Sequence, residues 1–243
     1  MGYSTLLGAV RHGRLIPWDD DIDVLMSRAD TEKLINILPS VAPDGYLLET
    51  QRMFDDYVNN FLKIRKDHTT YLQFESERNI SHHTGIFAGI FPADRRAPGP
   101  ISRRLQKICF AVNLLYNRGY AQKGRRTAFV QRLLLSFVPK RYHRRLSNWA
   151  GEKSRKWTDN TTYMLVFPCT IRDCSRFYPA DLFDHLEKIP FNGKEYYTFR
   201  ERSFLRIRYG DYMEMPPENE RVWKHYPILV DFKRNYEELE AGV

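Results

Sequence analysis

The sequence predicts an α+β fold that contains a helical insertion. Segments of strand character lie at 46–50, 57–65 and 69–74, where short apolar runs are bounded by polar or turn residues. Asn192-Gly193, between two apolar runs, indicates a β-hairpin. Residues 101–157 instead repeat their apolar side chains with helical spacing. With 42% apolar residues in a chain of 243, the sequence can bury a substantial core.

The first predicted element is a short helix in the run Thr5-Leu-Leu-Gly-Ala-Val-Arg-His12. Ser4 and Thr5 stand before the apolar residues, where a hydroxyl can cap a helix, and Gly13 can end it. A helix start offers free N–H groups and the positive end of the helix dipole, so it is a candidate phosphate site. A plain structural cap is the alternative at this position.

A strand is predicted to begin after Pro17-Trp18 and to include the acidic run that follows. On an extended chain Asp19, Asp21 and Asp23 point to one face, about 6.6 Å apart from two rises of roughly 3.3 Å. Such carboxylates repel one another unless a cation lies among them, and oxygen ligands suit Mg²⁺ or Mn²⁺. A solvated acidic loop is the alternative. A calcium-binding EF-hand loop is disfavoured because Val24 stands where that loop requires glycine.

The next elements extend the predicted sheet. A helix is expected at 29–38, stopped by Pro39, and a buried strand at 85–92, closing at its proline. In the strand predicted at 57–65, Lys63 shares a face with Phe61. A lysine on an otherwise apolar face is a reasonable partner for a phosphate, and a surface lysine is the alternative.

These stretches resemble the signature of the LicD family, which includes bacterial phosphocholine transferases and fukutin-type ribitol-phosphate transferases. Further agreement comes from Phe61-Leu-Lys-Ile64, Ile90-Phe-Pro-Ala-Asp94, Tyr209-Gly-Asp-Tyr-Met213 and His225. The resemblance implies a nucleotidyltransferase-like fold, a mixed β-sheet flanked by helices. It divides the chain into a catalytic core at 1–97, a basic helical insertion at 98–160, and a C-terminal part of the same domain at 161–243.

The chain departs from the family pattern at three points. Only four residues precede the Thr5 run, where the family has a helix and a strand, so the sheet is expected to lack its first strand. Ser4 stands where the family usually has glycine. Gly89 stands where the family has an aspartate, and glycine can neither bind metal nor accept a proton. Asp94 or Asp19 is expected to substitute for it; the alternative is a weakened or inactive enzyme.

The resemblance implies transfer of phosphocholine, or a similar phospho-alcohol or alditol phosphate, from a CDP-linked donor to a hydroxyl of a cell-surface glycan. The acceptor would be of the teichoic acid, lipopolysaccharide or capsule type, and CMP would leave. Asp21, Asp23 and Asp94 would be catalytic, and Asp19, Asp21 and Asp23 would hold Mg²⁺ or Mn²⁺. Substrate-binding roles fall to Ser4, Thr5, Arg11, Lys63 and Asp211. A catalytically inactive relative that binds nucleotide or a membrane surface is the alternative.

The basic character of the chain is concentrated in residues 101–157. They contain fifteen Lys and Arg against the single acid Glu152, so the rest of a chain with net charge +8 is acidic. Apolar residues at helical spacing, such as Phe129, Leu133 and Phe137, predict basic amphipathic helices that can contact an anionic membrane, which suits a lipid-linked glycan acceptor. The basic face of ordinary core-packing helices is the alternative. Nucleic acid is not expected as a partner, since no recognised binding motif occurs.

The cysteines and the chain start indicate a reducing compartment. Cys109, Cys169 and Cys174 form no Cys-x-x-Cys pattern, so reduced thiols are expected. The sequence has no leader pattern and no run of 18 apolar residues, which favours a cytoplasmic protein, with peripheral contact on the inner membrane face. The glycosylation patterns at Asn79 and Asn160 are interpreted as chance matches.

Overall fold

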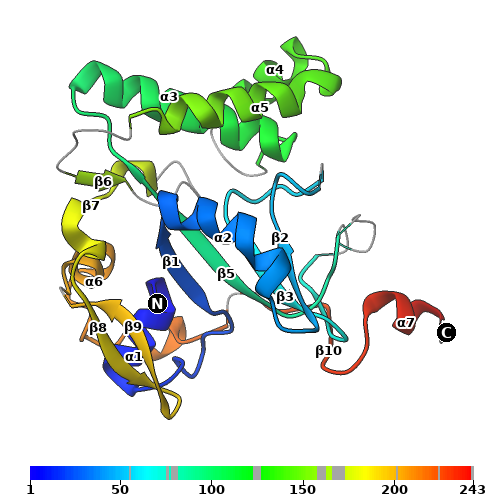
Figure 1. The fold of residues 1–243 in the computed structure, drawn as a ribbon. Coiled ribbons are helices and arrows are strands. Elements are labelled where there is room, and N and C mark those ends of the chain that lie inside the picture. The colour runs from blue at the N-terminus through cyan, green and yellow to red at the C-terminus, as the bar shows by residue number, and fades with distance from the viewer. Residues whose placement is uncertain are drawn as a thin grey trace. The chain divides into compact units, whose positions relative to one another are not determined.

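Helices and strands alternate along the chain in the computed structural model (Figure 1), which confirms the predicted α+β fold. The structure describes residues 1–54, 56–74, 77, 82–122, 127–157, 163–165, 173–200, 202–223 and 225–241. Contacts divide the chain into two units, the first of Met1–Asp56, Phe61–Pro92 and Asp181–Val243, the second of Tyr57–Asn60 and Ala93–Ala180. The boundaries expected at 97 and 160 stay a prediction.

Strand β5 (Phe87–Arg95) is the centre of the sheet in the first unit. Strand β3 (Leu62–Lys66) pairs with β5 in antiparallel fashion, and β2 (Tyr46–Glu49) pairs with β3 in the same way. Strand β1 (Asp23–Ser27) also pairs with β5. Residues far apart in the sequence are thereby placed on neighbouring strands.

Helix α2 (Arg28–Val41) packs against this sheet. The Ser27 hydroxyl caps it by accepting a hydrogen bond of 3.1 Å from the backbone N–H of Asp30. Helix and strands bury an apolar layer made of Val24, Met26, Leu34, Ile35, Leu38, Leu48, Leu62, Ile64 and Ile90. The predicted stop at Pro39 is wrong. Pro39 lies in the last turn, where helical bonding continues to the backbone N–H of Ala42.

Buried charged residues lie on the opposite face of the sheet, because side chains alternate along each strand. Lys63 lies opposite both Glu49 and Gly89 in the strand register. Glu49 is 1% exposed and accepts a hydrogen bond of 2.6 Å from Nε of Arg65. The Lys63 ammonium lies 6.0 Å from the centre of the Phe61 ring, which confirms that the two side chains share a face.

The first unit also contains the predicted hairpin. Strands β8 (Leu186–Phe191) and β9 (Lys194–Phe199) are joined by Asn192 and Gly193, both with positive φ, as a tight primed turn requires. Helix α1 (Tyr3–His12) ends at Gly13, whose φ of 64° confirms the expected stop. The other elements are β4 (Thr70–Leu72), paired with β10 (Leu229–Asp231), then α6 (Ser203–Tyr209), α7 (Tyr236–Ala241) and 3-10 helices at Ala180–Phe183 and Glu218–Glu220.

The second unit is mainly helical. Helices α3 (Pro100–Arg118) and α5 (Lys140–Arg155) pack side by side, and the predicted helix around Phe129 is α4 (Ala128–Phe137). Inside the α3–α5 pair, the Asn113 side chain donates a hydrogen bond of 2.9 Å to the carbonyl of Ser147. The remaining elements are β6 (Tyr163–Leu165), β7 (Phe177–Pro179) and a 3-10 helix at Asp173–Ser175.

The predicted end of the buried strand at Pro92 is wrong, since β5 continues to Arg95. Pairing with β3 stops at Ile90 and pairing with β6 starts at Asp94. Pro92 therefore lies where neither ladder needs the N–H group that proline lacks.

No disulfide joins Cys109 and Cys174. Cys169 and the two glycosylation patterns at Asn79 and Asn160 lie outside the described residues.

Candidate active site

The start of helix α1 is fastened to the start of strand β1. The Thr5 hydroxyl, buried in the core, accepts a hydrogen bond of 2.8 Å from the backbone N–H of Asp23, and the N–H of Gly2 bonds to the Asp23 carbonyl at 2.9 Å. The expected capping by Ser4 or Thr5 is wrong. Gly2 occupies the cap position because the helix begins at Tyr3, so Ser4 and Thr5 lie inside its first turn, and the Thr5 hydroxyl bonds to Asp23.

Three carboxylates meet where β1 begins. Burial, and then the charges of Asp21 and Asp19, raise the pKa of Asp23 to about 8. Burial also raises the pKa of Asp19 to about 6, against a hydrogen bond from the Ser4 hydroxyl that lowers it. The pKa of Asp21 is raised mainly by burial. These side chains therefore lie within electrostatic reach of one another, as the spacing predicted.

The backbone that presents these carboxylates is not the predicted strand. Strand β1 begins only at Asp23, and the preceding residues form a turn in which the N–H of Asp19 bonds to the carbonyl of Ile16 at 2.9 Å. The strand prediction fails for Asp19 to Ile22 because the chain bends to meet a distant segment around His225.

His225 contacts Asp20 in residues 17–22, which are called the aspartate turn. Its backbone N–H donates to one carboxylate oxygen of Asp20 at 3.2 Å, and its Nδ1 lies 3.0 Å from the other. The same Nδ1 is 3.7 Å from a carboxylate oxygen of Asp21. The Tyr71 hydroxyl donates to the His225 carbonyl at 2.8 Å, and the Trp223 indole donates to the Pro17 carbonyl at 3.2 Å. The C-terminal segment thus fixes the aspartate turn.

Two overlapping sets of side chains could hold a divalent cation. The predicted set is Asp19, Asp21 and Asp23. Among the described residues, the ligand atoms of Asp20, Asp21 and His225 lie within 4.8 Å of one another, so they could hold an ion as well. Asp21 belongs to both sets and is the residue on which either metal site depends.

Two arginines lie beside this cluster. The charge of Arg208, at the end of α6, lowers the pKa of Asp23, and its guanidinium lies 4.9 Å from the centre of the Tyr3 ring. Arg11 donates through Nη1 to the carbonyl of Glu214 at 3.1 Å, and burial lowers its pKa. Sequence reasoning selected Arg11 but missed Arg208, Asp20 and His225 as site residues. For Arg208 and His225, adjacency to the Tyr209 motif and membership of the family pattern were the only signals.

The sheet face behind the carboxylates contains the lysine predicted to bind phosphate. The Lys63 side chain is 4% exposed, and its ammonium lies 4.0 Å from the centre of the Phe87 ring. Burial, reinforced by the charge of Arg65, lowers its pKa to about 8. No carboxylate lies within ion-pair distance of this ammonium in the part of the chain that the structure describes, and the charges of Glu49 and Glu77 only partly offset the lowering of its pKa.

Gly89 lies next to Asp23 on this same face. Its N–H bonds to the carbonyl of Ile22 at 2.8 Å. A Cβ atom at position 89 would lie 3.4 Å from Oδ1 of Asp23 and 2.8 Å from the ring of Phe91. An aspartate there, as in the family pattern, would therefore point toward the acidic cluster, provided that the Phe91 ring moved.

The two remaining predicted aspartates are Asp94 and Asp211. Asp94 belongs to the second unit, where it is 2% exposed and pairs with Leu165 through the backbone. Asp211 is exposed on the bend after α6, and its carbonyl accepts a hydrogen bond of 3.2 Å from the N–H of Glu214. Their predicted roles stay predictions.

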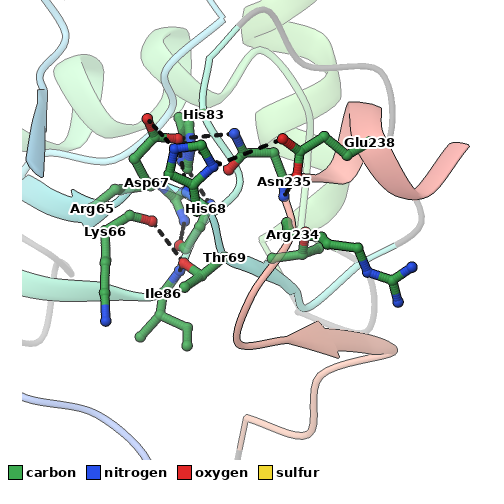
Figure 2. Close-up of polar contacts among 12 residues, drawn as sticks. Arg65, Lys66, Asp67, His68, Thr69, His83, Ile86, Arg234, Asn235 and Glu238 are labelled. Carbon is green, nitrogen blue, oxygen red and sulfur yellow. Dashed lines mark hydrogen bonds and ion pairs between the residues drawn. The ribbon is translucent and has the colours of Figure 1, made fainter. Parts of the chain in front are cut away.

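Figure 2 shows a second polar cluster of the first unit, around Asp67. Oδ1 of Asp67 accepts hydrogen bonds from the Asn235 side chain at 2.9 Å and the His68 backbone at 2.8 Å, and lies 3.1 Å from Nε2 of His83. The Asn235 hydrogen bond is the main reason that the pKa of Asp67 falls to about 2. The cluster ties the turn after β3 to the start of α7 and contains none of the predicted site residues.

Residues 1–113 match the family model described as LicD/FKTN/FKRP, nucleotidyltransferase domain. This segment is a LicD-family domain. Of the predicted site residues, only Asp211 lies outside it. The chain is also similar to the lipopolysaccharide cholinephosphotransferase LicD of Haemophilus influenzae, with 24% identity over 242 residues that cover 93% of this chain and 85% of that protein.

Two shorter similarities were also found. An uncharacterized protein of Rickettsia prowazekii is 43% identical over 52 residues, which are 21% of this chain and 20% of that protein. Another from Rickettsia typhi is 39% identical over 51 residues, 21% of this chain and 16% of that protein. No solved structure matches the chain significantly. In the described part of the chain, no helix is both long and apolar enough to span a bilayer.

Proposed function

We propose that the protein transfers phosphocholine, or a related phospho-alcohol or alditol phosphate, from a CDP-linked donor to a hydroxyl of a cell-surface glycan. The convergence of Asp19, Asp21 and Asp23 inside the LicD-family segment is the observation on which the proposal depends. Similarity to a protein named lipopolysaccharide cholinephosphotransferase supports a lipopolysaccharide-type acceptor. Teichoic acid and capsule glycans are further acceptors to test.

The three carboxylates fit a divalent cation. Asp23 is 7% exposed and accepts no hydrogen bond through its carboxylate from any described residue, and Oδ2 of Asp19 is buried without a partner among them. Mg²⁺ or Mn²⁺ would be held by Asp21 and Asp23 together with Asp19. When bound, the ion would neutralise charge on the diphosphate of the donor.

The other side chains would position the donor and the acceptor. The first turn of α1 at Ser4 and Thr5, with Arg11 and Lys63, would hold donor phosphate oxygens. His225 would keep Asp21 oriented through its contacts with the aspartate turn. Asp19 or Asp94 would accept the proton of the attacking hydroxyl, and Asp211 would contact a substrate. Phosphoryl transfer depends mainly on such positioning and charge stabilisation.

The decisive experiment follows CMP release from a panel of CDP-linked donors, CDP-choline and CDP-alditols, with lipopolysaccharide-type acceptors. Asp21→Asn is expected to lower the rate by about 10³-fold or more with an unchanged circular dichroism spectrum. Asp67→Asn is the matched control, since it removes one carboxylate of the same unit outside the site, and it should keep near wild-type activity. Full activity of the Asp21→Asn, Asp23→Asn double variant would refute the transferase.

One observation favours a second candidate, a nucleotide-binding relative without turnover. Gly89 removes the aspartate that the family places beside the acidic cluster. Calorimetric titration with CDP in Mg²⁺ separates the two candidates. Tight, metal-dependent binding together with no CMP release from any donor would support the inactive relative over the transferase.

A further inference from the structure

Helix α4 exposes an unusually apolar face for a helix of a water-exposed unit. Phe129 is 73% exposed, Leu133 45% and Phe137 72%, and they follow one another at intervals of four residues, so they lie on one side of the helix. Val130 and Leu134, 53% and 45% exposed, widen the same side. These five side chains are called the α4 apolar face. The helix contains no acidic residue.

The orientation of this face is fixed by hydrogen bonds to the rest of the second unit. The Tyr116 hydroxyl, on α3, donates to the carbonyl of Leu134 at 2.7 Å. The backbone N–H of Gln122 donates to the side chain of Gln131 at 3.0 Å. At the end of the helix, Nε2 of His143 lies 2.8 Å from the carbonyl of Val138. The helix is therefore held with its phenylalanines outward, and the exposure is a property of the folded unit.

Basic residues outnumber acidic ones strongly in α4 and in the two other helices of this unit. Arg132 lies on α4 itself and is exposed, and α5 begins with the exposed cations Lys140 and Arg141, followed by Arg145. Glu152 is the only acidic residue in the sequence of α3, α4 and α5. Helix α3 adds exposed apolar side chains between its own arginines, with Leu105 51% and Ile108 57% exposed. Such a surface attracts anions and offers them apolar contact.

Charge complementarity and apolar exposure together favour a bilayer over other partners. Phenylalanine and leucine side chains enter the boundary between head groups and acyl chains, while arginine and lysine reach back to lipid phosphates. A nucleic acid would use the cations but would leave the leucines and phenylalanines in water. We propose that the α4 apolar face docks on an anionic lipid bilayer, with Arg132, Lys140, Arg141 and Arg145 contacting the head groups.

The test is co-sedimentation of the full-length protein with vesicles. Binding to equimolar phosphatidylcholine and phosphatidylglycerol is expected to be about tenfold stronger than to phosphatidylcholine alone, and to weaken in high salt. The triple variant Phe129→Ser, Leu133→Ser, Phe137→Ser should lose about tenfold in binding with its circular dichroism spectrum unchanged, because the replaced side chains are exposed. The charge variant Arg141→Glu, Arg145→Glu should lose binding to anionic vesicles selectively.

A matched control replaces exposed apolar residues of the first unit, Ile37→Ser, Val41→Ser and Phe232→Ser, and should bind vesicles as the wild type does. Equal binding of the wild type and the α4 triple variant would overturn the proposal. So would a dimer that dissociates in the α4 triple variant without vesicle binding, since the occupant would then be a second copy of the chain. Vesicle binding needs no transfer chemistry, so Asp21→Asn should retain it even if the proposed function fails.

Discussion

Two carboxylates of the first unit, Asp67 and Asp23, have opposite environments. Asp67 is surrounded by donors from Asn235, the His68 backbone and His83, and its pKa falls to about 2. Asp23 is more buried, lies beside other carboxylates, and its pKa rises to about 8. A structural carboxylate has its charge satisfied within the protein. The acidic cluster leaves its charge unsatisfied, which is the condition a ligand can relieve.

Removing the buried charge of Asp23 should have the largest effect on the contrast between Asp23 and Asp67. Because folding raises its pKa from 3.8 to about 8, the folded state loses stability relative to the unfolded state as pH rises through that interval. Asp23→Asn should therefore stabilise the metal-free protein by about 3 kcal/mol at pH 8 and by almost nothing at pH 3. Urea denaturation at both pH values measures this. An equal effect at the two pH values would contradict the assignment.

Lys63 is a buried cation whose pKa, like that of Asp23, is shifted toward its neutral form by burial. Its pKa is lowered from 10.5 to about 8, so the wild type gains stability as pH rises between these values. Lys63→Met should stabilise the protein by about 2 kcal/mol below pH 8, and the gain should vanish above pH 10.5. If Lys63 binds donor phosphate as proposed, the same variant should weaken CDP binding in a calorimetric titration.

An aspartate at position 89, as in the family pattern, adds a further carboxylate to the acidic cluster. Gly89→Asp places a carboxylate beside Asp23 and forces the Phe91 ring to shift. The variant should unfold at a lower temperature than the wild type without metal, and Mg²⁺ should raise its melting temperature by more than it raises that of the wild type. Gly89→Asn controls for the steric change. Identical Mg²⁺ responses of Gly89→Asp and Gly89→Asn would contradict the predicted position of the new carboxylate.

The smallest effect is expected at the structural cluster. Asn235→Ala removes the donor that contributes most to the low pKa of Asp67 and should lower stability by about 1 kcal/mol at pH 7. The stabilisation from Asp67 is present above pH 3.8 and disappears as pH falls toward 2, so the variant and the wild type should converge in acid. Chemical denaturation measures the difference, and the Mg²⁺ response should stay unchanged.

Features encoded locally in the sequence were predictable. Asp19, Asp21 and Asp23 are so close in the sequence that their spacing alone predicts that they come together. The hairpin turn at Asn192 follows from local backbone preference. The predictions that failed concern residues whose structure depends on contacts with distant parts of the sequence. The predicted strand through Asp19 gives way to a turn because His225 holds Asp20, and no local pattern reveals a partner two hundred positions away.

The same separation was the obstacle for Arg208, whose charge acts on Asp23 from the far end of the chain. Spacing also could not show whether position 89 faces the carboxylates. The distance of 3.4 Å from a Cβ atom at position 89 to Oδ1 of Asp23 decides it.

Trp223 and His225 hold the aspartate turn through hydrogen bonds to Pro17 and Asp20, which lie more than two hundred residues earlier in the chain. Residues near the start of the chain leave the ribosome long before their partners near the end. The acidic cluster can therefore reach its final arrangement only after the chain has been synthesised through His225, and the nascent chain carries an incomplete centre until then.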